Sequence, residues 1–336
     1  ADIIKNSGFI LHDIPISRGS SGPVSTVKTL LAIIKLFYKV KPNLIHLVTI
    51  KPILLGGIAA RITNIPGVIV AISGLGYIFI DQGFVASFRR FFVRVLYKVS
   101  LGHKNLRIIC QNSNDLDEIQ RATNVSNDSF SLIDGSGVAL NKFIYVPDLN
   151  KIPKVMMASR LLKDKGVIEF AEAAAILKGK NIDAEFILVG DPDLDNPSSI
   201  KSSQVKQWEQ KGILNCWGHI DNMQDILSQA SIVVLPSYRE GFPKVLIEAA
   251  ACGRAVITTD VAGCRDAIYN GVTGVLVPAK DANSLAAAIF DLVGSPEKCK
   301  QMGLEGRKMA EQRFDENIVI EKHMSLYDQV LSNKNH

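Results

Sequence analysis

The sequence predicts an α/β protein made of two doubly wound, Rossmann-like domains. Its 336 residues are too many for one ordinary domain and sufficient for two. An apolar content of 47% with 21% charged residues is typical of a protein with a substantial core. Short apolar runs alternate along the chain with amphipathic stretches of helical length, which is the pattern of parallel βαβ units.

The first half of the chain contains near-continuous apolar runs, as buried parallel strands do. These runs predict strands at 44–49, 67–73, 106–112 and 130–135, with helices at 26–40 and 88–101. Residues 143–154 contain two prolines and no periodicity, and are the best linker. We therefore expect an N-terminal domain at 1–146, a second domain at 152–315, and a helix at 316–336 that crosses back toward the first domain.

The second half repeats the same scheme. Strands are predicted at 154–159, 184–190, 232–236, 255–260 and 274–278, and helices at 166–179, 201–211, 222–230, 243–252, 283–293, 296–312 and 316–332. In such sheets ligands bind beyond the carboxyl ends of the strands. Unusual residues that follow the strands are therefore candidate binding residues.

Charge and cysteine content narrow the class of protein. The net charge of +5 is compatible with an anionic substrate or a membrane surface and requires neither. No basic tract is interleaved with aromatic residues, so no nucleic-acid partner is expected. The five cysteines are scattered without a C-x-x-C pair, which is typical of reduced thiols in a cytoplasmic protein.

The stretch SYREGFPKVLIEAAACG (237–253) follows a predicted strand. We expect Pro243 to occupy the first helical position and to start a helix. The amides of Gly241, Phe242 and Lys244 would then form an electropositive helix terminus that suits phosphate oxygens.

Two carboxylates, Glu240 and Glu248, stand eight residues apart in this stretch. Glu240 precedes the start of the helix. Glu248 lies about 7 Å from that start along the helix axis. Carboxylates that accept paired hydrogen bonds suit the vicinal hydroxyls of sugars. The alternative is two ordinary surface glutamates on an amphipathic helix. Their coincidence with a glycine, a proline and a helix terminus favours binding.

Two further segments follow strands. Arg160 and Lys165 precede Gly166 at a predicted helix start, and such cations can hold a diphosphate. By itself, an arginine and a lysine at this spacing before a glycine more often belong to a solvated loop. Together with the motif at 237–253, they indicate a diphosphate-binding site. In the segment 216–227, the residues Gly218, His219 and Asp221 could meet a nucleobase, although Asp221 could equally be a plain helix N-cap.

Together these segments resemble the retaining glycosyltransferases of family 4, which carry an E-x7-E motif. The motif matches residues 240–248, the diphosphate pair matches Arg160 and Lys165, and a following family segment matches 258–278. The resemblance extends to a bacterial subfamily that builds O-antigen, capsule and glycan precursors, through 46–52, 73–80, 135–138 and 236–244. It implies the GT-B architecture, in which two Rossmann-like domains face each other across a cleft.

The resemblance also implies the chemistry and the site. The expected reaction moves a sugar, with an N-acetylhexosamine favoured, from a UDP-sugar to a saccharide on polyprenyl diphosphate. Transfer would proceed with retention and without a metal or other cofactor. Positive charge at the leaving diphosphate would stabilise the transition state. By family match, the catalytic residues are Glu240, Arg160 and Lys165; the donor-binding residues are Glu248, Gly241, Phe242, Pro243, Lys244, Gly218, His219 and Asp221; and the acceptor-side residues are Thr49, Lys51, Gly74, Gly76 and Tyr77.

Some features depart from the family or leave alternatives. Many relatives carry His-x-His after the first strand seen here, whereas this chain has His46-Leu47-Val48, so a structural role is expected for His46. The family's first strand, glycine-rich loop, helix and second strand do not precede Ala1, so we expect the chain to lack its natural start. The alternative functions are a nucleotide-sugar epimerase of the same architecture and an inactive scaffold subunit.

A basic amphipathic segment at 84–104 has two interpretations. Its aromatic and aliphatic residues alternate with Arg89, Arg90, Arg94 and Lys98. Such a helix can lie on an anionic bilayer surface, or its apolar face can pack on the first sheet. With a lipid-linked acceptor, the first interpretation places the protein at the cytoplasmic face of the inner membrane.

Overall fold

The computed structural model describes residues 2–16, 22–74, 95–147, 151–193 and 195–333. The chain divides into two compact units, of which the first contains residues 1–109, 117–131 and 324–336 and the second contains 110–116 and 132–323. This division differs from the predicted boundary at 146–152. Residues 132–146 belong to the second unit because Val138 N–H donates to the Phe314 carbonyl at 2.7 Å and Phe143 is part of the second core.

The first unit contains a four-stranded sheet. Its strands, in spatial order, are β1 (Leu44–Val48), β2 (Gly67–Ile72), β3 (Leu106–Cys110) and β4 (Phe130–Leu132). Strands β1 and β2 are parallel, with Leu44 opposite Gly67 and Val48 opposite Ala71. The predicted strands are present and end one to three residues early. All residues of β2 except Ala71 are buried, as expected for an internal parallel strand.

Among the described residues, the first unit contains the helices α1 (Asp2–Asn6), α2 (Pro23–Val40) and α3 (Ile50–Ile62), and α5 (Ser113–Ala122) begins in the second unit and continues in the first. Helix α2 packs against α3. It begins at Pro23, earlier than predicted, because proline has the backbone conformation that the first helical turn requires. The end of α12 (Glu316–Ser332) also belongs to this unit, where the Asn105 amide donates to the Val330 carbonyl at 2.7 Å.

The predicted basic helix at 84–104 is described only in part. Residues 95–100 are helical, and Tyr97, Ser100 and Leu101 at its end are buried. This end of the segment therefore packs in the first unit. The arginines of the predicted membrane-facing surface, Arg89, Arg90 and Arg94, lie outside the described residues, as do the phenylalanines Phe84, Phe88, Phe91 and Phe92.

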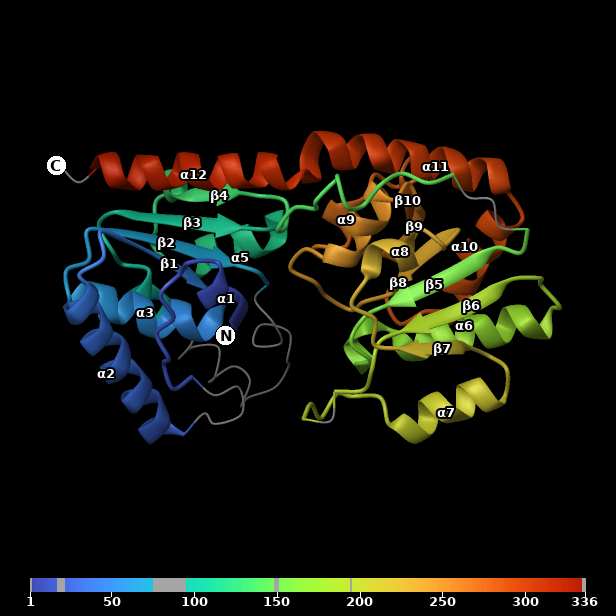
Figure 1. Ribbon diagram of the computed structural model, residues 1–336, viewed down its shortest axis with the longest axis horizontal. Coiled ribbons are helices and arrows are strands. Elements are labelled where there is room, and N and C mark those ends of the chain that lie inside the picture. The colour runs from blue at the N-terminus through green and yellow to red at the C-terminus, as the bar shows by residue number, and fades with distance from the viewer. Residues whose placement is uncertain (1, 17–21, 75–94, 148–150, 194, 334–336) are drawn as a thin grey trace. The chain divides into compact units, whose positions relative to one another are not determined.

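The second unit contains a six-stranded sheet (Figure 1). Its spatial order is β10 (Gly274–Val277), β9 (Ala255–Thr259), β8 (Ile232–Leu235), β5 (Lys154–Ala158), β6 (Glu185–Val189) and β7 (Asn215–Gly218). All five neighbouring pairs are parallel. Strands β8 and β9 are buried along their whole length. The sequence of β8 is entirely apolar, whereas β9 ends in two buried threonines, Thr258 and Thr259.

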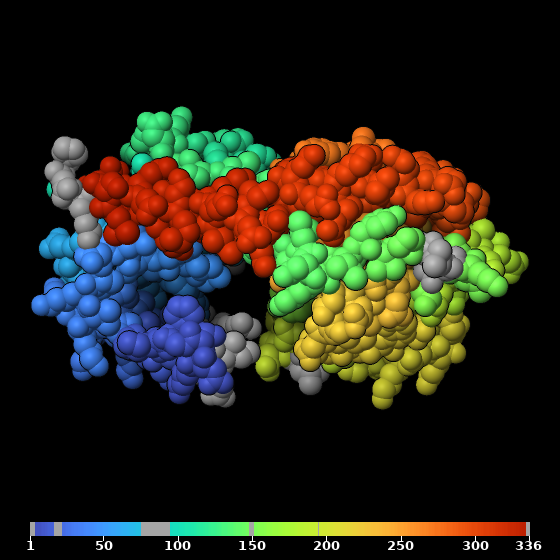
Figure 2. All heavy atoms as spheres, turned by 45° about the horizontal axis from the view of Figure 1, so that its top comes forward, coloured from blue at the N-terminus to red at the C-terminus, as the bar shows by residue number. Residues whose placement is uncertain are grey.

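Helices connect most of these strands, and further helices come after the last strand, β10. They are α6 (Val167–Gly179), α7 (Ser202–Gln210), α8 (Met223–Leu227), α9 (Lys244–Ala251), α10 (Ala282–Val293) and α11 (Pro296–Met309), and a π-helical turn at Ala310–Phe314 precedes α12. Helix α6 packs with α10, and α9 packs with α8 and α11. Helices α11 and α12 form much of the surface seen in Figure 2.

The strand order locates the position at which this sheet can bind a ligand. The chain leaves β5 toward β6 in one direction and leaves β8 toward β9 in the other. Right-handed crossovers therefore place α6 and α9 on opposite faces of the sheet. The carboxyl ends of β5 and β8 flank the topological switch point, where doubly wound sheets bind their ligands. The predicted fold class is confirmed.

No helix within the described ranges combines the length and the apolar composition that a transmembrane span requires.

Candidate active site

Two loops meet at the switch point between β5 and β8. One follows β5 and carries Arg160 and Lys165; the other follows β8 and carries Glu240. Gly166 explains their close approach, because a Cβ atom there would lie 2.1 Å from the Pro236 carbonyl oxygen. Its backbone, with φ of 76°, also lies in the left-handed region that favours glycine. Glycine after Lys165 thus brings the start of α6 against the end of β8.

Glu240 is held by two side chains. Its Oε1 atom lies 2.6 Å from Lys165 Nζ and accepts a hydrogen bond from Ser237 Oγ at 2.7 Å. The side chains of Lys165 and Glu240 are only 17% and 12% exposed. Glu240 is therefore not an ordinary surface glutamate, and the structure brings it together with one of the two cations predicted to bind diphosphate.

The backbone of this loop is supported from a third segment. Glu240 N–H donates to the Ala262 carbonyl at 3.2 Å. A Cβ atom at Gly263 would lie 2.5 Å from the Gly241 carbonyl oxygen and 2.6 Å from that of Glu240. Gly263 is thus the residue that lets the segment after β9 reach the loop.

Helix α9 begins at Lys244, with Pro243 as its N-cap residue in an extended conformation. The prediction that Pro243 is the first helical residue is therefore wrong by one position. The Pro243 ψ of 113° is not helical, and it turns the chain into the helix one residue later. Among the described residues, the Phe242 N–H has no hydrogen-bond acceptor, so an amide at this terminus is available to a ligand.

Glu248 is buried, with 7% of its surface exposed. Its Oε1 atom lies 3.5 Å from Lys244 Nζ, one helical turn earlier. Burial raises the pKa of Glu248 above its ordinary value, and the charge of Lys244 offsets part of that rise. The alternative of a solvated surface glutamate is therefore excluded for Glu248 as well.

A cavity of about 370 Å³ lies beside Glu248. Its lining comes from the segments after β5 and β6, the segment after β7, and α9, and includes Ser159, Arg160, Gly190, Asp193, His219, Met223, Val245 and Glu248. Arg160 is mostly exposed, and its Nη1 atom lies 3.6 Å from Asp193 Oδ2. The structure thus brings Arg160, His219 and Glu248 to one cavity.

The residues predicted to meet a nucleobase follow β7. Gly218 ends that strand, and its carbonyl accepts a hydrogen bond from Gly190 N–H at 2.8 Å. His219 Nε2 lies 3.1 Å from Asp221 Oδ1, and both side chains are largely exposed. The alternative role of Asp221 as a helix N-cap is wrong, because the N-cap residue of α8 is Asn222.

The acceptor-side candidates that are described lie at the carboxyl ends of β1 and β2 in the first unit. Thr49 is the N-cap residue of α3 and has a φ of 73°, which is strained for a β-branched residue. Lys51 lines an apolar cavity of about 150 Å³ together with Leu54, Leu55, Ile58 and Leu96. Gly74 follows β2. Gly76 and Tyr77 lie outside the described residues.

His46 contacts a tyrosine of the same unit. Its Nδ1 atom lies 2.7 Å from the Tyr327 hydroxyl, and the two rings meet edge to face. Burial raises the pKa of Tyr327, so its hydroxyl stays protonated and can donate to the imidazole. This contact fits the structural role expected for His46.

Sequence reasoning missed several residues that hold the loop after β8. Tyr238 donates to Glu169 Oε1 at 2.6 Å, and Arg239 Nη2 lies 2.6 Å from Asp115 Oδ1. Asn112 donates to the Gly241 carbonyl at 2.7 Å. Arg239 stands inside the motif, but its partner is 124 residues away in sequence, so no local pattern indicates the pair.

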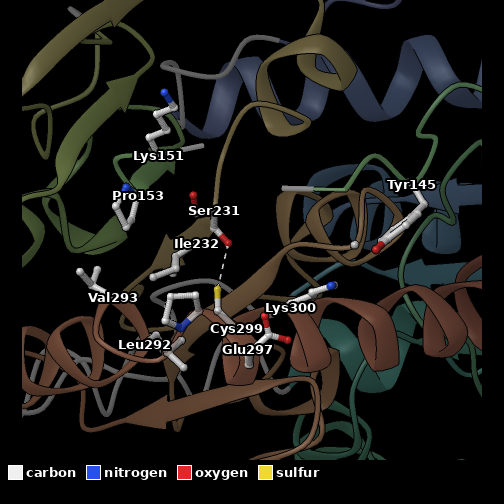
Figure 3. A pocket seen from close by; sticks show the side chains of 12 residues that line it. Tyr145, Lys151, Pro153, Ser231, Ile232, Leu292, Val293, Glu297, Cys299 and Lys300 are labelled. Carbon is white, nitrogen blue, oxygen red and sulfur yellow. Dashed lines mark hydrogen bonds between the residues drawn. The ribbon is translucent and has the colours of Figure 1, made fainter. Parts of the chain in front are cut away.

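The second unit has another cavity, of about 210 Å³, with a different lining from the cavity beside Glu248 (Figure 3). Its lining includes Tyr145, Lys151, Cys299 and Lys300, and Cys299 Sγ contacts the Ser231 carbonyl at 3.3 Å. Ser231 directly precedes β8, so this cavity lies at the amino end of that strand. None of the predicted site residues lines it in the described part of the chain.

Comparisons with known proteins show the family of this chain. Residues 152–295 match the family described as "Glycosyl transferases group 1", and residues 2–112 match "Glycosyl transferase 4-like". The chain is 33% identical to the N,N'-diacetylbacillosaminyl-diphospho-undecaprenol alpha-1,3-N-acetylgalactosaminyltransferase of Campylobacter jejuni, over 98% of this chain and 88% of that protein. It is 28% identical to the capsular polysaccharide biosynthesis glycosyltransferase CapM of Staphylococcus aureus, over 96% and 86% of the two chains.

A solved structure has a similar fold. The crystal structure of Anabaena HepE in complex with UDP matches with a TM-score of 0.80 and 17% identity, over 98% of this chain and 88% of that chain. At that identity the likeness concerns the fold alone. The chain belongs to the group 1 glycosyltransferases, and the predicted family and transferase activity are confirmed.

Proposed function

We propose that this glycosyltransferase moves an N-acetylhexosamine from a UDP-sugar to a saccharide carried on polyprenyl diphosphate. The relative from C. jejuni, by its name, transfers N-acetylgalactosamine to a diphospho-undecaprenol-linked sugar, and it aligns with nearly the whole chain. The observation that carries the proposal is the buried carboxylate of Glu248 in a cavity that Arg160 also lines.

The proposed donor site extends along the loop after β8. Glu248 accepts hydrogen bonds from the ribose hydroxyls, and Arg160 and Lys165 face the diphosphate. Glu240 and the amide of Phe242 bind oxygens of the transferred sugar and of its phosphate. The Glu240–Lys165 pair at 2.6 Å supports this division, because it sets a sugar-binding acid directly beside a phosphate-binding cation. His219 and the residues around it bind the nucleobase.

The proposed chemistry is retaining transfer that requires no metal. Negative charge grows on the diphosphate as the bond to the sugar breaks. Arg160, Lys165 and the amides at the start of α9 stabilise that charge from fixed positions. The leaving phosphate takes the proton of the acceptor hydroxyl. Glu240 and Glu248 do not act as a glycosidase pair, since such carboxylates flank a bond from opposite sides and these two project from one loop and the helix that follows it.

The proposed acceptor-binding residues belong to the first unit. Thr49, Lys51 and Gly74 lie at the carboxyl ends of β1 and β2, and the strained Thr49 marks this edge as a place where function constrains the backbone. A lipid-linked acceptor places the enzyme at the cytoplasmic face of the inner membrane. Co-sedimentation with anionic vesicles tests this location. A variant with Arg89, Arg90 and Arg94 changed to Glu should remain in the supernatant, and equal partitioning of the two proteins would count against it.

A donor screen tests the proposed reaction. UDP release is followed with UDP-N-acetylgalactosamine, UDP-N-acetylglucosamine, UDP-galactose and UDP-glucose, each with a polyprenyl-diphosphate saccharide as acceptor. We expect turnover with an N-acetylhexosamine donor, no loss of turnover with excess EDTA, and an axial anomeric linkage in the product by NMR. Failure of the wild-type protein to bind UDP in calorimetry would remove the proposal.

A further inference from the structure

Asn112 contacts the loop that carries Glu240. It lies two residues after the end of β3, is completely buried, and belongs to the second unit. One N–H of its amide donates to the Gly241 carbonyl at 2.7 Å, and its Nδ2 atom also lies 2.9 Å from Asp115 Oδ2. Asn112 thus uses both amide hydrogens, one of them on the loop.

The rest of the cluster fixes Asn112 and the loop together. Asn112 Oδ1 accepts the Asp115 N–H at 2.8 Å, which is the hydrogen bond of a helix N-cap, here for α5. The other oxygen of the buried Asp115 lies 2.6 Å from Arg239 Nη2. The loop is therefore anchored on both sides of Glu240, at the Arg239 side chain and at the Gly241 carbonyl.

The anchor at Gly241 determines where the next amide points. A peptide unit is planar and trans, so its C=O and N–H point in opposite directions. A hydrogen bond that fixes the Gly241 carbonyl toward Asn112 consequently directs the Phe242 N–H away from Asn112. That N–H has no acceptor among the described residues, and it belongs to the terminus of α9 that the proposed function assigns to the donor.

We propose that Asn112 is a positioning residue for sugar transfer: it orients the Gly241–Phe242 peptide so that the Phe242 N–H meets the donor oxygen on which charge develops. The proposal rests on the proposed function of this loop. Asn112 itself touches no substrate. Asp115 and Arg239 keep Asn112 and the loop in register.

Removing a hydrogen-bond donor that is aimed at developing charge typically lowers kcat by about 10²–10³-fold. Misdirecting the Phe242 N–H should have a smaller effect of the same kind, a loss of at least about tenfold. UDP affinity should change by less than about threefold, because the interaction strengthens in the transition state and not in the ground state.

Two variants remove the hydrogen bond to the Gly241 carbonyl: one keeps the size of the side chain but adds a charge, and the other stays neutral but is shorter. Asn112→Asp keeps the size of the side chain and the N-cap acceptor but has no N–H for Gly241 and adds a charge. Asn112→Ser is neutral and also caps a helix, but its hydroxyl is too short to reach Gly241. Asn114→Asp, the same change at an exposed neighbour, is the matched control. We expect both Asn112 variants to lose kcat with UDP-N-acetylgalactosamine and the control to keep it.

A double variant separates positioning from stability. In Asn112→Asp/Asp115→Asn the amide and carboxylate are exchanged, so the two side chains can pair again and the net charge is restored, but nothing donates to the Gly241 carbonyl. We expect the exchange to recover part of the melting temperature lost in Asn112→Asp and none of the kcat. Recovery of kcat together with stability would overturn the proposal, as would loss of folding in all three variants.

Measurements on the wild-type protein distinguish failure of the positioning role of Asn112 from failure of the proposed function. If it binds UDP and turns over, and the Asn112 variants keep kcat within about twofold, the positioning role alone fails. If the wild-type protein neither binds UDP nor releases it from any UDP-sugar, the proposed function fails and the positioning role fails with it.

Discussion

Glu240 Oε1 lies 2.6 Å from Lys165 Nζ, and neither side chain is more than 17% exposed. The pair joins the two loops at the switch point of the second sheet. In the proposed site it also couples the acid that binds the transferred sugar to a cation that binds the diphosphate.

The first prediction concerns the Glu240–Lys165 pair. Glu240→Gln and Lys165→Met should each lower kcat by about 10²-fold or more, as loss of an electrostatic contact in the transition state does. The double variant should lose less than the product of the two, with a coupling of about 1–3 kcal/mol in a double-mutant cycle. Lys163→Met, an exposed lysine on the same loop, is the control. Strict additivity would show that the pair does not act as a unit.

The second prediction concerns the buried Glu248. Its raised pKa means that between about pH 4.5, the ordinary value, and the raised value the folded protein binds more protons than the unfolded chain. The ionised group therefore costs stability at neutral pH, and this cost disappears as the pH falls through the raised pKa. Glu248→Gln should raise the melting temperature at neutral pH and flatten its dependence on pH in that window. An unchanged melting curve would contradict this.

The same substitution should weaken the binding of UDP. Charge-assisted hydrogen bonds are worth about 1.5–3 kcal/mol each, so calorimetry should record a loss of at least about tenfold in affinity. The affinity of the wild-type protein for UDP should also decrease as the pH is lowered, because Glu248 becomes protonated. Glu248→Gln controls for the titration of UDP itself and should lose this component. A stabilised variant that binds UDP normally would remove Glu248 from the site.

The third prediction concerns Tyr238, whose hydroxyl donates to Glu169 at 2.6 Å. Burial and the hydrogen bond with this carboxylate raise the pKa of Tyr238, so the hydroxyl stays protonated at any working pH. Tyr238→Phe leaves the Glu169 carboxylate, 9% exposed, without this donor and should cost about 1–3 kcal/mol in the free energy of unfolding. Tyr38→Phe, at an exposed tyrosine, should cost less than about 0.5 kcal/mol. Urea unfolding measures both.

The fourth prediction concerns the cysteines, none of which forms a disulfide. Burial raises the pKa of Cys264, which lies near Glu240, to about 12 and that of Cys110 to about 12. Only the thiolate reacts, so both should resist iodoacetamide at pH 8. Cys216 is less buried, and burial raises its pKa only to about 11, so it should be alkylated first. Mass spectrometry of the native and the denatured protein checks the order; early labelling of Cys264 would contradict it.

The fold could be predicted from the sequence because its signal is local. Buried parallel strands such as β8 are apolar on both faces, and such runs stand out between glycines and prolines. Helix α3 gave no such signal. Its sequence contains a proline and two adjacent glycines, and the half-buried apolar residues Leu54, Leu55 and Ile58 lie outside its buried face, so no amphipathic period is visible.

The candidate site was only partly predictable for a related reason. Glu240, Glu248, Arg160 and Lys165 lie in motifs that follow strands, and the topology of the sheet brings such positions together. The supporting contacts are not local. Asn112 lies 129 residues from Gly241, and nothing in the sequence near either residue indicates that they meet. The strained φ of Thr49 likewise depends on tertiary packing and has no sequence signature.

A crystal structure of the protein with UDP tests the central claim most directly. The account predicts ribose hydroxyls within about 3 Å of the Glu248 carboxylate, with the diphosphate leading from the cavity beside Arg160 toward Lys165 and the Phe242 amide. UDP bound elsewhere, for example in the cavity lined by Tyr145 and Cys299, with Glu248 untouched, would contradict it.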